Sequence, residues 1–373
     1  MAEQLVQLGF KRIGIDAKWF FSGPVSNRIV IQNLLENLIK DNPGHKLVVF
    51  LNRKHRHLHF PYSEKDVERV YVWGGNNMIS NLLLLPLLGR KHRLDGILYQ
   101  NFGSFFGPRP WVYIHDLIFK SHPQFFTWKE RVYFSFMPFL LRFADKVITI
   151  SNSEKNRIQT HCPYLTAPVY VAQHGRNVAF QTRETFSEVE LERVKESYQL
   201  PHQFILFVGR LNDRKNIGNL LQALDLLDNP AHLVIVGEED WQLDPGLRER
   251  LNEGQQSGKL ILTGKVPFVD LPVLYSLATL FCFPSFAEGF GLPVLEAISA
   301  GIPVATSEKS AMEEVCGEAA MYFDPHSPES ISSAIQILLS DSGLREKLRE
   351  KGLAQSRMFD WKKSGTKIYE AIQ

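Results

Sequence analysis

Residues 286–304 read FAEGFGLPVLEAISAGIPV, which is the most informative stretch of the chain. The apolar segment LATLFCFPS precedes it and predicts a buried strand, so the order is strand, glutamate, glycine turn, helix and second glutamate. The N–H groups at a glycine-rich helix start form an anion site, and phosphate is its usual ligand. Glu288 and Glu296 add carboxylates that can bind hydroxyl groups. The stretch therefore predicts a site for a ligand that carries both phosphate and hydroxyl groups, as a sugar nucleotide does.

Outward from this stretch, strand and helix patterns alternate along the whole chain. Apolar segments such as KRIGID (11–16) and FILFVG (204–209) alternate with helical patterns such as 26–40 and 217–227. This alternation predicts parallel sheets covered by helices on both faces. Two such α/β domains in tandem would place a ligand cleft between the carboxyl ends of their sheets. We expect the linker at residues 177–202, where the strand pattern lapses, and mostly helices after residue 328.

The length and charge of the chain agree with two domains of different character. With 373 residues, the chain is long enough for two separate cores. Residues 1–180 carry 23 Lys and Arg against 12 Asp and Glu (+11), and the rest carry 19 against 28 (−9), which sums to the net +2. The basic half favours an anionic acceptor or an anionic membrane surface. Nucleic acid is not expected as a partner, because no nucleic-acid-binding motif accompanies the charge.

The localisation expected from the sequence is cytoplasmic. No secretory signal is visible, and the longest apolar run, 82–88, is too short to span a bilayer. Three widely spaced cysteines fit reduced, buried thiols. The basic segment 53–59 and the apolar-to-basic run 78–93 are candidates for contact with the inner face of the membrane. The alternative for the latter is a core helix with a solvated basic end.

The second informative stretch is FVGRLNDRKNIGNLLQAL (207–224). A predicted strand ends at Gly209, Arg210 follows, and Lys215 precedes a helix with Asn216 as its expected N-cap. Two cations at the carboxyl end of a strand can neutralise a diphosphate and the charge that develops on a leaving group. The alternative is a solvated basic loop.

The two glutamates and His115 also have purely structural interpretations. Glu288 could be a capping carboxylate and Glu296 an exposed helical residue. That interpretation fits Glu296 poorly, because this residue stands between Leu295 and Ala297 in a largely apolar helix. His115, at the end of VYIHD, could equally be a histidine whose ring nitrogens are satisfied at a strand end.

Taken together, these motifs resemble glycosyltransferase family 4, whose retaining enzymes have the GT-B fold. EGFGLPVLE matches the E-x7-E signature of that family. IGIDAKWF, VYIHDLIF, VITISNSEK, VGRLNDRKN, LTGKV and GIPVATS extend the resemblance over most of the chain, in order. The resemblance implies two Rossmann-like domains facing across a deep cleft. Residues 1–180 would bind the acceptor, residues 181–357 would bind the donor, and a helix within 358–373 would cross back onto the first domain.

The resemblance also implies roles for individual residues. Arg210 and Lys215 would hold the two phosphates, Glu288 would contact the donor sugar, and His115 would reach the transferred sugar; these four are the expected catalytic residues. Glu296 would bind the ribose hydroxyls. The other expected donor-binding positions lie at turns and strand ends and act largely through their backbone: Gly23, Gly209, Gly264, Lys265, Val266, Phe290, Gly291 and Leu292.

One segment departs from the family pattern. Relatives usually carry a glycine-rich loop after the first strand, which approaches the diphosphate. The corresponding residues here read SGPVSNRIV, with Gly23 followed by Pro24. Gly23 permits a close approach, but Pro24 donates no N–H group.

The resemblance implies transfer of a hexose, of mannose or glucose type, from a nucleotide diphospho-sugar to a hydroxyl of a glycan or lipid-linked acceptor. Such enzymes retain the anomeric configuration and need no protein nucleophile, cofactor or metal, and the chain has no Asp-x-Asp motif. Polysaccharide biosynthesis at the cell envelope is the expected setting. Two alternatives stay open: a nucleotide-sugar epimerase on the same fold, and a non-catalytic subunit that binds a sugar nucleotide.

Overall fold

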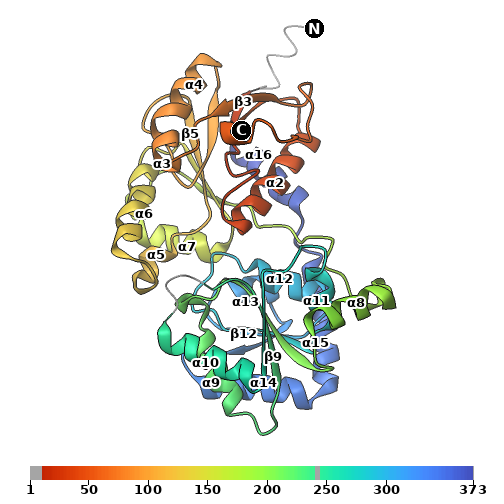
Figure 1. The fold of residues 1–373 in the computed structure, drawn as a ribbon. Helices are drawn as coiled ribbons and strands as arrows, with labels where there is room; N and C mark the ends of the chain where they lie inside the picture. Colours follow the sequence, from red (N-terminus) through yellow and green to blue (C-terminus); the bar gives the residue numbers. More distant parts are fainter. Residues whose placement is uncertain (1–10, 240–243, 373) are drawn as a thin grey trace. The chain divides into compact units, whose positions relative to one another are not determined.

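The computed structural model describes residues 11–239 and 244–372, which form two compact units (Figure 1). Unit 1 runs to Gly175 and also includes the residues from Asp360 onward, whereas unit 2 is Arg176–Phe359. The chain therefore passes from one unit to the other twice. The boundaries expected from the sequence are 180/181 and 357/358, a few residues from those in the structure.

Unit 1 is built on a seven-stranded sheet with the order β3-β2-β1-β4-β5-β6-β7. Every pairing between neighbouring strands is parallel. β4 is buried along its whole length, since helices cover the sheet on both faces. The strands are β1 (Arg12–Asp16), β2 (Lys46–Asn52), β3 (Glu68–Val72), β4 (Gly96–Gln100), β5 (Arg109–Ile114), β6 (Lys146–Thr149) and β7 (Val169–Val171).

The helices of unit 1 connect successive strands, except for the last one, which comes from the end of the chain. A π-helical turn (Ser80–Leu84) joins α3 to α4. The helices are α2 (Val25–Lys40), α3 (Asn77–Ile79), α4 (Leu85–Lys91), α5 (Ile118–Ser121), α6 (Trp128–Leu141), α7 (Asn152–His161) and α16 (Trp361–Ile372).

Unit 2 contains a six-stranded sheet with the order β10-β9-β8-β11-β12-β13, again parallel throughout. The strands are β8 (Phe204–Val208), β9 (His232–Val236), β10 (Leu260–Gly264), β11 (Leu280–Phe283), β12 (Val304–Ser307) and β13 (Ala320–Phe323). The helices are α8 (Glu188–Tyr198), α9 (Ile217–Asp225), α10 (Pro245–Gln256), α11 (Leu271–Leu277), α12 (Leu292–Ser299), α13 (Ala311–Cys316), α14 (Pro328–Ser340) and α15 (Ser342–Ser356).

Both sheets have the doubly wound topology predicted from the sequence. Counted along the chain within each unit, the first six strands lie in the order third, second, first, fourth, fifth, sixth, and the seventh strand of unit 1 follows at the edge. The direction of winding therefore reverses beside the first strand. Ligands of such sheets bind outside the carboxyl ends of the strands at this reversal. In unit 2 the reversal lies between β8 and β11, and the two motifs singled out in the sequence follow these two strands.

The prediction of a linker at residues 177–202 is wrong, because these residues belong to unit 2 and part of them forms a helix there. Ser187 and Glu190 form a capping box at the start of α8, and α8 buries Leu191 and Val194. Ser-x-x-Glu before an apolar residue is a known signal for a helix start, so the sequence did contain the information.

The last helix, α16, belongs to unit 1, where it packs on α2. The backbone of Gly175 lies so close to Trp361 that a Cβ atom on Gly175 would stand 2.1 Å from the Trp361 nitrogen. The ring of Trp361 also stacks on His174, at 5.3 Å between centroids. Glycine at position 175 therefore allows the end of the chain to pack against the end of unit 1's first segment.

Two further sequence expectations concern membranes and cysteines. None of the helices in the described ranges is long and apolar enough to cross a membrane. Cys162, Cys282 and Cys316 are buried and free, as expected.

Candidate functional site

Glycines stand at the neighbouring carboxyl ends of β8, β9 and β10: Gly209 and Gly237 directly follow the first two strands, and Gly264 ends the third. The Gly209 N–H donates to Val236 O at 2.9 Å, and the Gly237 N–H donates to Gly264 O at 3.0 Å. Gly237 has a φ of +151°, and a Cβ atom on it would lie 1.9 Å from Gly209 O. Only glycine fits there, so the backbones at this edge of the sheet come together without intervening side chains.

The loop after β11 places Glu288 at the same edge, among groups that we call the Glu288 cluster: Glu288, Lys215, Arg214 and Ser285. Glu288 Oε1 lies 2.5 Å from Lys215 Nζ and 2.8 Å from Arg214 Nη1. The Ser285 hydroxyl donates to the same oxygen at 2.6 Å. Burial acts to raise the pKa of Glu288, but the two cations and the hydrogen bonds outweigh it and lower the pKa to about 2.

Lys215 is held in place by groups on several sides. Only 7% of the residue is exposed, and its ammonium lies 4.6 Å from the centroid of the Phe283 ring. The short 3₁₀ helix that carries it, Asp213–Lys215, is capped by the side chain of Asn212. A lysine buried in this way keeps a fixed position, which a site for an anionic ligand requires.

Asn216 does not cap α9 as the sequence suggested. It stands at the N-cap position but has a left-handed backbone, with φ +59°, and its side chain accepts no hydrogen bond from the helix. Its amide instead donates to Pro284 O at 3.0 Å and to Pro325 O at 2.7 Å. Asn216 therefore joins the basic loop to the loops after β11 and β13.

The two predicted cations have different surroundings. Lys215 is buried against Glu288, whereas Arg210 is exposed, one residue beyond Gly209. The second cation on Glu288 is Arg214, which we did not select from the sequence although it stands next to Lys215. Ser285 was also missed, because a serine after a strand carries no signal of its own.

The glycine turn after Glu288 leads directly into α12. Gly291 is the N-cap residue, with φ +102°, and as a glycine it offers no side-chain oxygen to the first N–H groups of the helix. Leu292 is the first helical residue, and Phe290 is buried with its ring 5.7 Å from that of Phe359. The three predicted backbone positions thus lie at an uncapped helix start.

Glu296 lies in the second turn of α12 and is partly buried. The hydroxyl of Tyr275, a fully buried residue of α11, donates to Glu296 Oε2 at 3.0 Å. Burial raises the pKa of Glu296 to about 8, against the opposing effect of this hydrogen bond. The carboxyl group is therefore mostly protonated at neutral pH. Tyr275 was missed because nothing in its local sequence connects it with a residue 21 positions away.

The predicted base-binding positions follow β10, the edge strand of the sheet. Gly264 has a φ of +64°, which a glycine adopts without strain, and Lys265 is exposed. Gly264 is joined to the rest of the sheet edge through Gly237.

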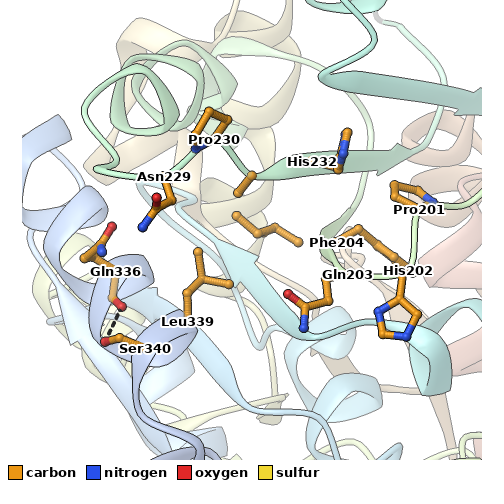
Figure 2. Close-up of a pocket in the computed structure, with 12 residues that line it drawn as sticks. Pro201, His202, Gln203, Phe204, Asn229, Pro230, His232, Gln336, Leu339 and Ser340 are labelled. Carbon is orange, nitrogen blue, oxygen red and sulfur yellow. Dashed lines mark hydrogen bonds between the residues drawn. The ribbon is translucent and has the colours of Figure 1, made fainter.

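A hollow of about 450 Å³ lies elsewhere in unit 2 (Figure 2). Its walls come from the amino ends of β8 and β9 and from the end of α14, including Phe204, His232 and Leu339. This is the opposite end of the strands from the Glu288 cluster. None of the predicted site residues lines it.

In unit 1, His115 follows β5 and is 6% exposed. Its Nε2 lies 2.9 Å from Gln100 Oε1, and its backbone N–H donates to Asn101 Oδ1 at 3.1 Å. Burial lowers the pKa of His115 to about 4, so the ring is neutral at pH 7. With the Gln100 side chain in this orientation, its carbonyl oxygen accepts from Nε2 and leaves Nδ1 as the acceptor nitrogen; the opposite amide orientation would exchange the two roles.

A buried ion pair lies at the same edge of unit 1. Lys18 Nζ is 2.7 Å from Asp16 Oδ1, with both side chains at most 3% exposed, and it also contacts Asn81. Asp16 in turn accepts from the Gln100 N–H at 3.4 Å. This polar group connects the end of β1 to the residue that orients His115, and we did not select it from the sequence.

Gly23, the remaining predicted position, is exposed just before α2. Its φ of +120° favours glycine, and a Cβ atom there would lie 2.9 Å from the ring of Trp19. Pro24 occupies the N-cap position of α2 and provides no side-chain cap.

Comparison with known families and proteins identifies the family of the chain. The model of Glycosyltransferase Family 4 matches residues 28–180, and that of Glycosyl transferases group 1 matches residues 189–355. O-antigen chain mannosyltransferase B of Escherichia coli is 33% identical over 266 residues, which cover 69% of this chain and 68% of that protein. The chain belongs to glycosyltransferase family 4. It is a group 1 glycosyltransferase, and its relatives make it a hexosyltransferase.

Two further proteins similar to this family 4 chain differ in how much of their own length the match covers. A serotype-specific mannosyltransferase, WbdA of Escherichia coli, is 30% identical over 269 residues, which cover 68% of this chain but only 32% of that protein. The crystal structure of Anabaena HepE in complex with UDP-glucose superposes with a TM-score of 0.72 at 15% identity, covering 97% of this chain and 99% of the other. The fold is GT-B, as predicted.

Proposed function

We propose that the chain transfers a hexose from a nucleotide diphospho-sugar to a hydroxyl of a glycan or lipid-linked acceptor, with retention at the anomeric carbon. The observation that carries this proposal is the Glu288 cluster, with its two cations at the winding reversal of a parallel sheet. The uncapped start of α12 follows Glu288 within the same loop. Both features suit an anionic ligand.

A bound diphosphate would change the role of Glu288. Without ligand, its carboxylate neutralises Lys215 and Arg214. A diphosphate brings two or more negative charges and would take over these cations, together with Arg210. Glu288 would then be able to accept a hydrogen bond from a hydroxyl of the donor sugar. The cluster therefore serves as a preformed pair of cations whose counter-ion is exchanged when the donor binds.

Retention follows if the leaving diphosphate itself acts as the base. The bond from the anomeric carbon to the phosphate oxygen breaks, and a bond to the acceptor oxygen forms on the same face of the sugar. The proton of the acceptor hydroxyl passes to an oxygen of the departing diphosphate. Lys215, Arg214 and Arg210 stabilise the charge on that group, so we propose that no metal is required.

His115 and Glu296 would orient the donor. The neutral ring of His115 has Nδ1 as its acceptor nitrogen, which suits a hydroxyl of the transferred sugar. Glu296 would bind the ribose hydroxyls. The mannosyltransferase relatives favour mannose as the sugar, and their place in O-antigen synthesis favours polysaccharide synthesis at the cell envelope. HepE was solved with UDP-glucose, which supports a nucleotide sugar as the donor.

Thermal-shift screening against UDP-, GDP- and ADP-sugars tests this proposal first, because a ligand that binds the native state raises its melting temperature. The stabilising donor is then incubated with and without acceptor glycans, in the presence of EDTA. We expect a glycoside with retained configuration, formed only when acceptor is present. An epimerised nucleotide sugar without acceptor would support the epimerase instead. Binding without transfer over a broad acceptor panel would support the non-catalytic subunit.

A further inference from the structure

Helix α6 presents a row of large apolar side chains to solvent. Between 42% and 65% of each of these residues is exposed. We call them the aromatic face: Trp128, Val132, Phe136 and Phe139 of α6, together with Phe143, two residues beyond its end. At about 100° per residue the four helical residues fall within an arc of about 80° on one side of the helix. Single exposed apolar residues are common, but a contiguous row of this kind marks an interaction surface.

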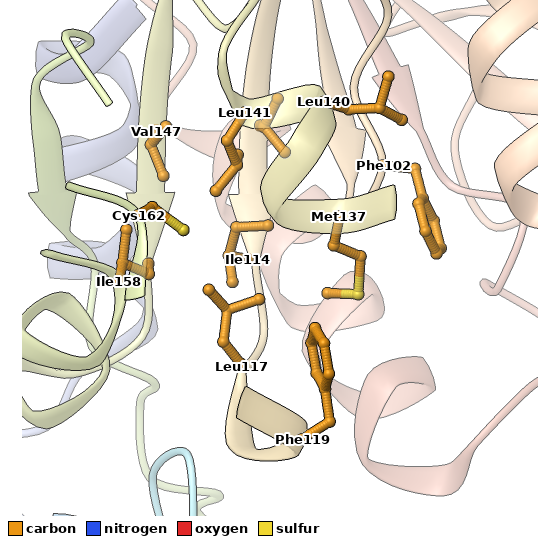
Figure 3. Close-up of a cluster of buried hydrophobic side chains, with 11 residues drawn as sticks. Phe102, Ile114, Leu117, Phe119, Met137, Leu140, Leu141, Val147, Ile158 and Cys162 are labelled. Carbon is orange, nitrogen blue, oxygen red and sulfur yellow. The ribbon is translucent and has the colours of Figure 1, made fainter. Parts of the chain in front are cut away.

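The aromatic face is not the side on which α6 packs. Met137, Leu140 and Leu141 point the other way, into a buried cluster with Ile114 of β5 and Val147 of β6 (Figure 3). The helix is thus apolar on two opposite sides, and only one of them is covered by the sheet. An amphipathic helix on a soluble protein would carry polar residues on the outer side.

Neighbouring elements of unit 1 expose further large apolar side chains. The ring of Phe105, 55% exposed, lies 6.1 Å from that of Phe143. On α3, the π-helical turn and α4, the residues Ile79, Leu83 and Leu87 are 43–56% exposed. These elements share a core with α6, because Met78 and Leu82 pack against the same buried cluster.

The charges around this surface are mostly positive. Residues 79–143 contain eight Lys and Arg against three Asp and Glu. Lys129 and Arg131 are exposed beside the aromatic face, and Arg142 lies 4.9 Å from the ring of Tyr164. Glu130, the acidic residue of α6, is engaged in the capping box with Thr127. The surface therefore combines aromatic rings with a majority of positive charges.

We propose that the aromatic face docks on an anionic lipid leaflet, with its rings among the headgroups and the flanking cations against lipid phosphates. Aromatic side chains interleaved with Lys and Arg are the composition of helices that lie in a membrane interface. Each basic residue near an anionic leaflet contributes on the order of 1 kcal/mol. From the sequence, 53–59 and 78–93 were candidates for membrane contact, with a core helix that has a solvated basic end as the alternative; the structure adds α6 as a further candidate. This docking goes beyond the glycosyl transfer and does not depend on it.

Vesicle flotation tests the proposal with the full chain. The vesicles contain phosphatidylcholine alone or with phosphatidylglycerol. The double variant Phe136→Asp/Phe139→Asp is compared with Val189→Asp/Val269→Asp, which changes two apolar residues of unit 2 that are even more exposed. We expect the wild type to float with the anionic vesicles. The bound-to-free ratio should fall about tenfold or more in the α6 variant and stay unchanged in the control.

A second variant, Lys129→Gln/Arg131→Gln, tests the charges. It should weaken binding to the anionic vesicles and reduce the effect of added salt, while the melting temperature stays that of the wild type. Failure of the wild type to float with anionic vesicles would overturn the proposal and leave a protein partner for the surface. Equal flotation of the Phe136→Asp/Phe139→Asp variant and the wild type would show that another surface binds the lipid.

Discussion

Glu288 and Glu296 stand eight residues apart, yet the structure puts one in a loop with two cations and the other in a helix facing a tyrosine. The pKa of Glu288 is lowered to about 2, whereas that of Glu296 is raised to about 8. Both are shielded from water, so burial alone acts in the same direction on both. The cations decide the outcome: Glu288 is an ion, and Glu296 is mostly a neutral acid that is available to hydrogen bond. A pair with opposite protonation states suits a ligand with both a charged and a hydroxylated part.

The largest effect should follow from removing a cation. Lys215→Ala deletes the ammonium that lies 2.5 Å from Glu288 and that we propose to bind the diphosphate. We expect kcat to fall on the order of a hundredfold, because one fixed charge at a developing anion commonly contributes a few kcal/mol. Steady-state assays with the sugar nucleotide measure this. Arg248→Ala, which removes an exposed arginine of unit 2, should leave kcat unchanged. Near-normal turnover of Lys215→Ala would rule out the proposed role.

Glu288→Gln should destabilise the unliganded protein by about 2 kcal/mol at pH 7, because Lys215 and Arg214 lose the charge that they face. The folded pKa of about 2 lies below the ordinary value of 4.5, so the stabilisation is present above pH 4.5 and is lost as the pH falls toward 2. Urea unfolding from pH 7 down to pH 3 should show the two proteins converging. A constant difference over this range would contradict the assignment.

Glu296→Gln should stabilise the folded protein in alkaline solution, which is the opposite of the effect expected for Glu288→Gln. The folded pKa of about 8 lies above the ordinary 4.5, so ionisation of Glu296 costs stability as the pH rises from 4.5 through 8. The glutamine variant avoids that cost and should therefore be more stable than the wild type at pH 9. We expect a difference of only about 1–2 kcal/mol, because the partial exposure of Glu296 reduces the effect of burial. Thermal unfolding at pH 5 and pH 9 measures this. A variant less stable than the wild type at pH 9 would show that the carboxylate is needed for the fold.

The smallest effect should come from Tyr275→Phe. This change removes the hydroxyl that donates to Glu296 at 3.0 Å, so it should raise the pKa of Glu296 further and cost about 1 kcal/mol of stability. A ¹³C-detected titration of the carboxyl group gives the pKa directly. The titration of Glu288 serves as the internal control and should not move. An unchanged pKa of Glu296 would mean that water replaces the lost hydroxyl.

Local patterns predicted the parts of this molecule that depend on local chemistry. Buried strands have continuous apolar runs, so the strands expected from KRIGID, FILFVG and LATLFCFPS are present in the structure as β1, β8 and β11. The E-x7-E stretch predicted that a glycine turn would start a helix, and α12 starts there. These features follow from backbone preferences and burial, which nearby residues determine.

Partnerships between distant residues could not be predicted in this way. The sequence favoured Asn216 as a helix cap, but its amide donates to carbonyl groups 68 and 109 residues away. In the same way, nothing near Glu288 in the sequence specifies Arg214 as its partner, and nothing near Glu296 specifies Tyr275. The charge states of the two glutamates depend on these long-range contacts, so only the folded chain reveals them.

The passage of the chain between the two units has a consequence for the order of folding. Unit 2 is one continuous segment, whereas unit 1 needs α16, which is synthesised after all of unit 2. Arg176–Phe359 can therefore complete its core while the ribosome is still at work, although it is second in sequence. Unit 1 stays incomplete, with the surface of α2 uncovered, until α16 has emerged. A ribosome stalled before residue 360 should thus display a protease-resistant second unit attached to a protease-sensitive first one.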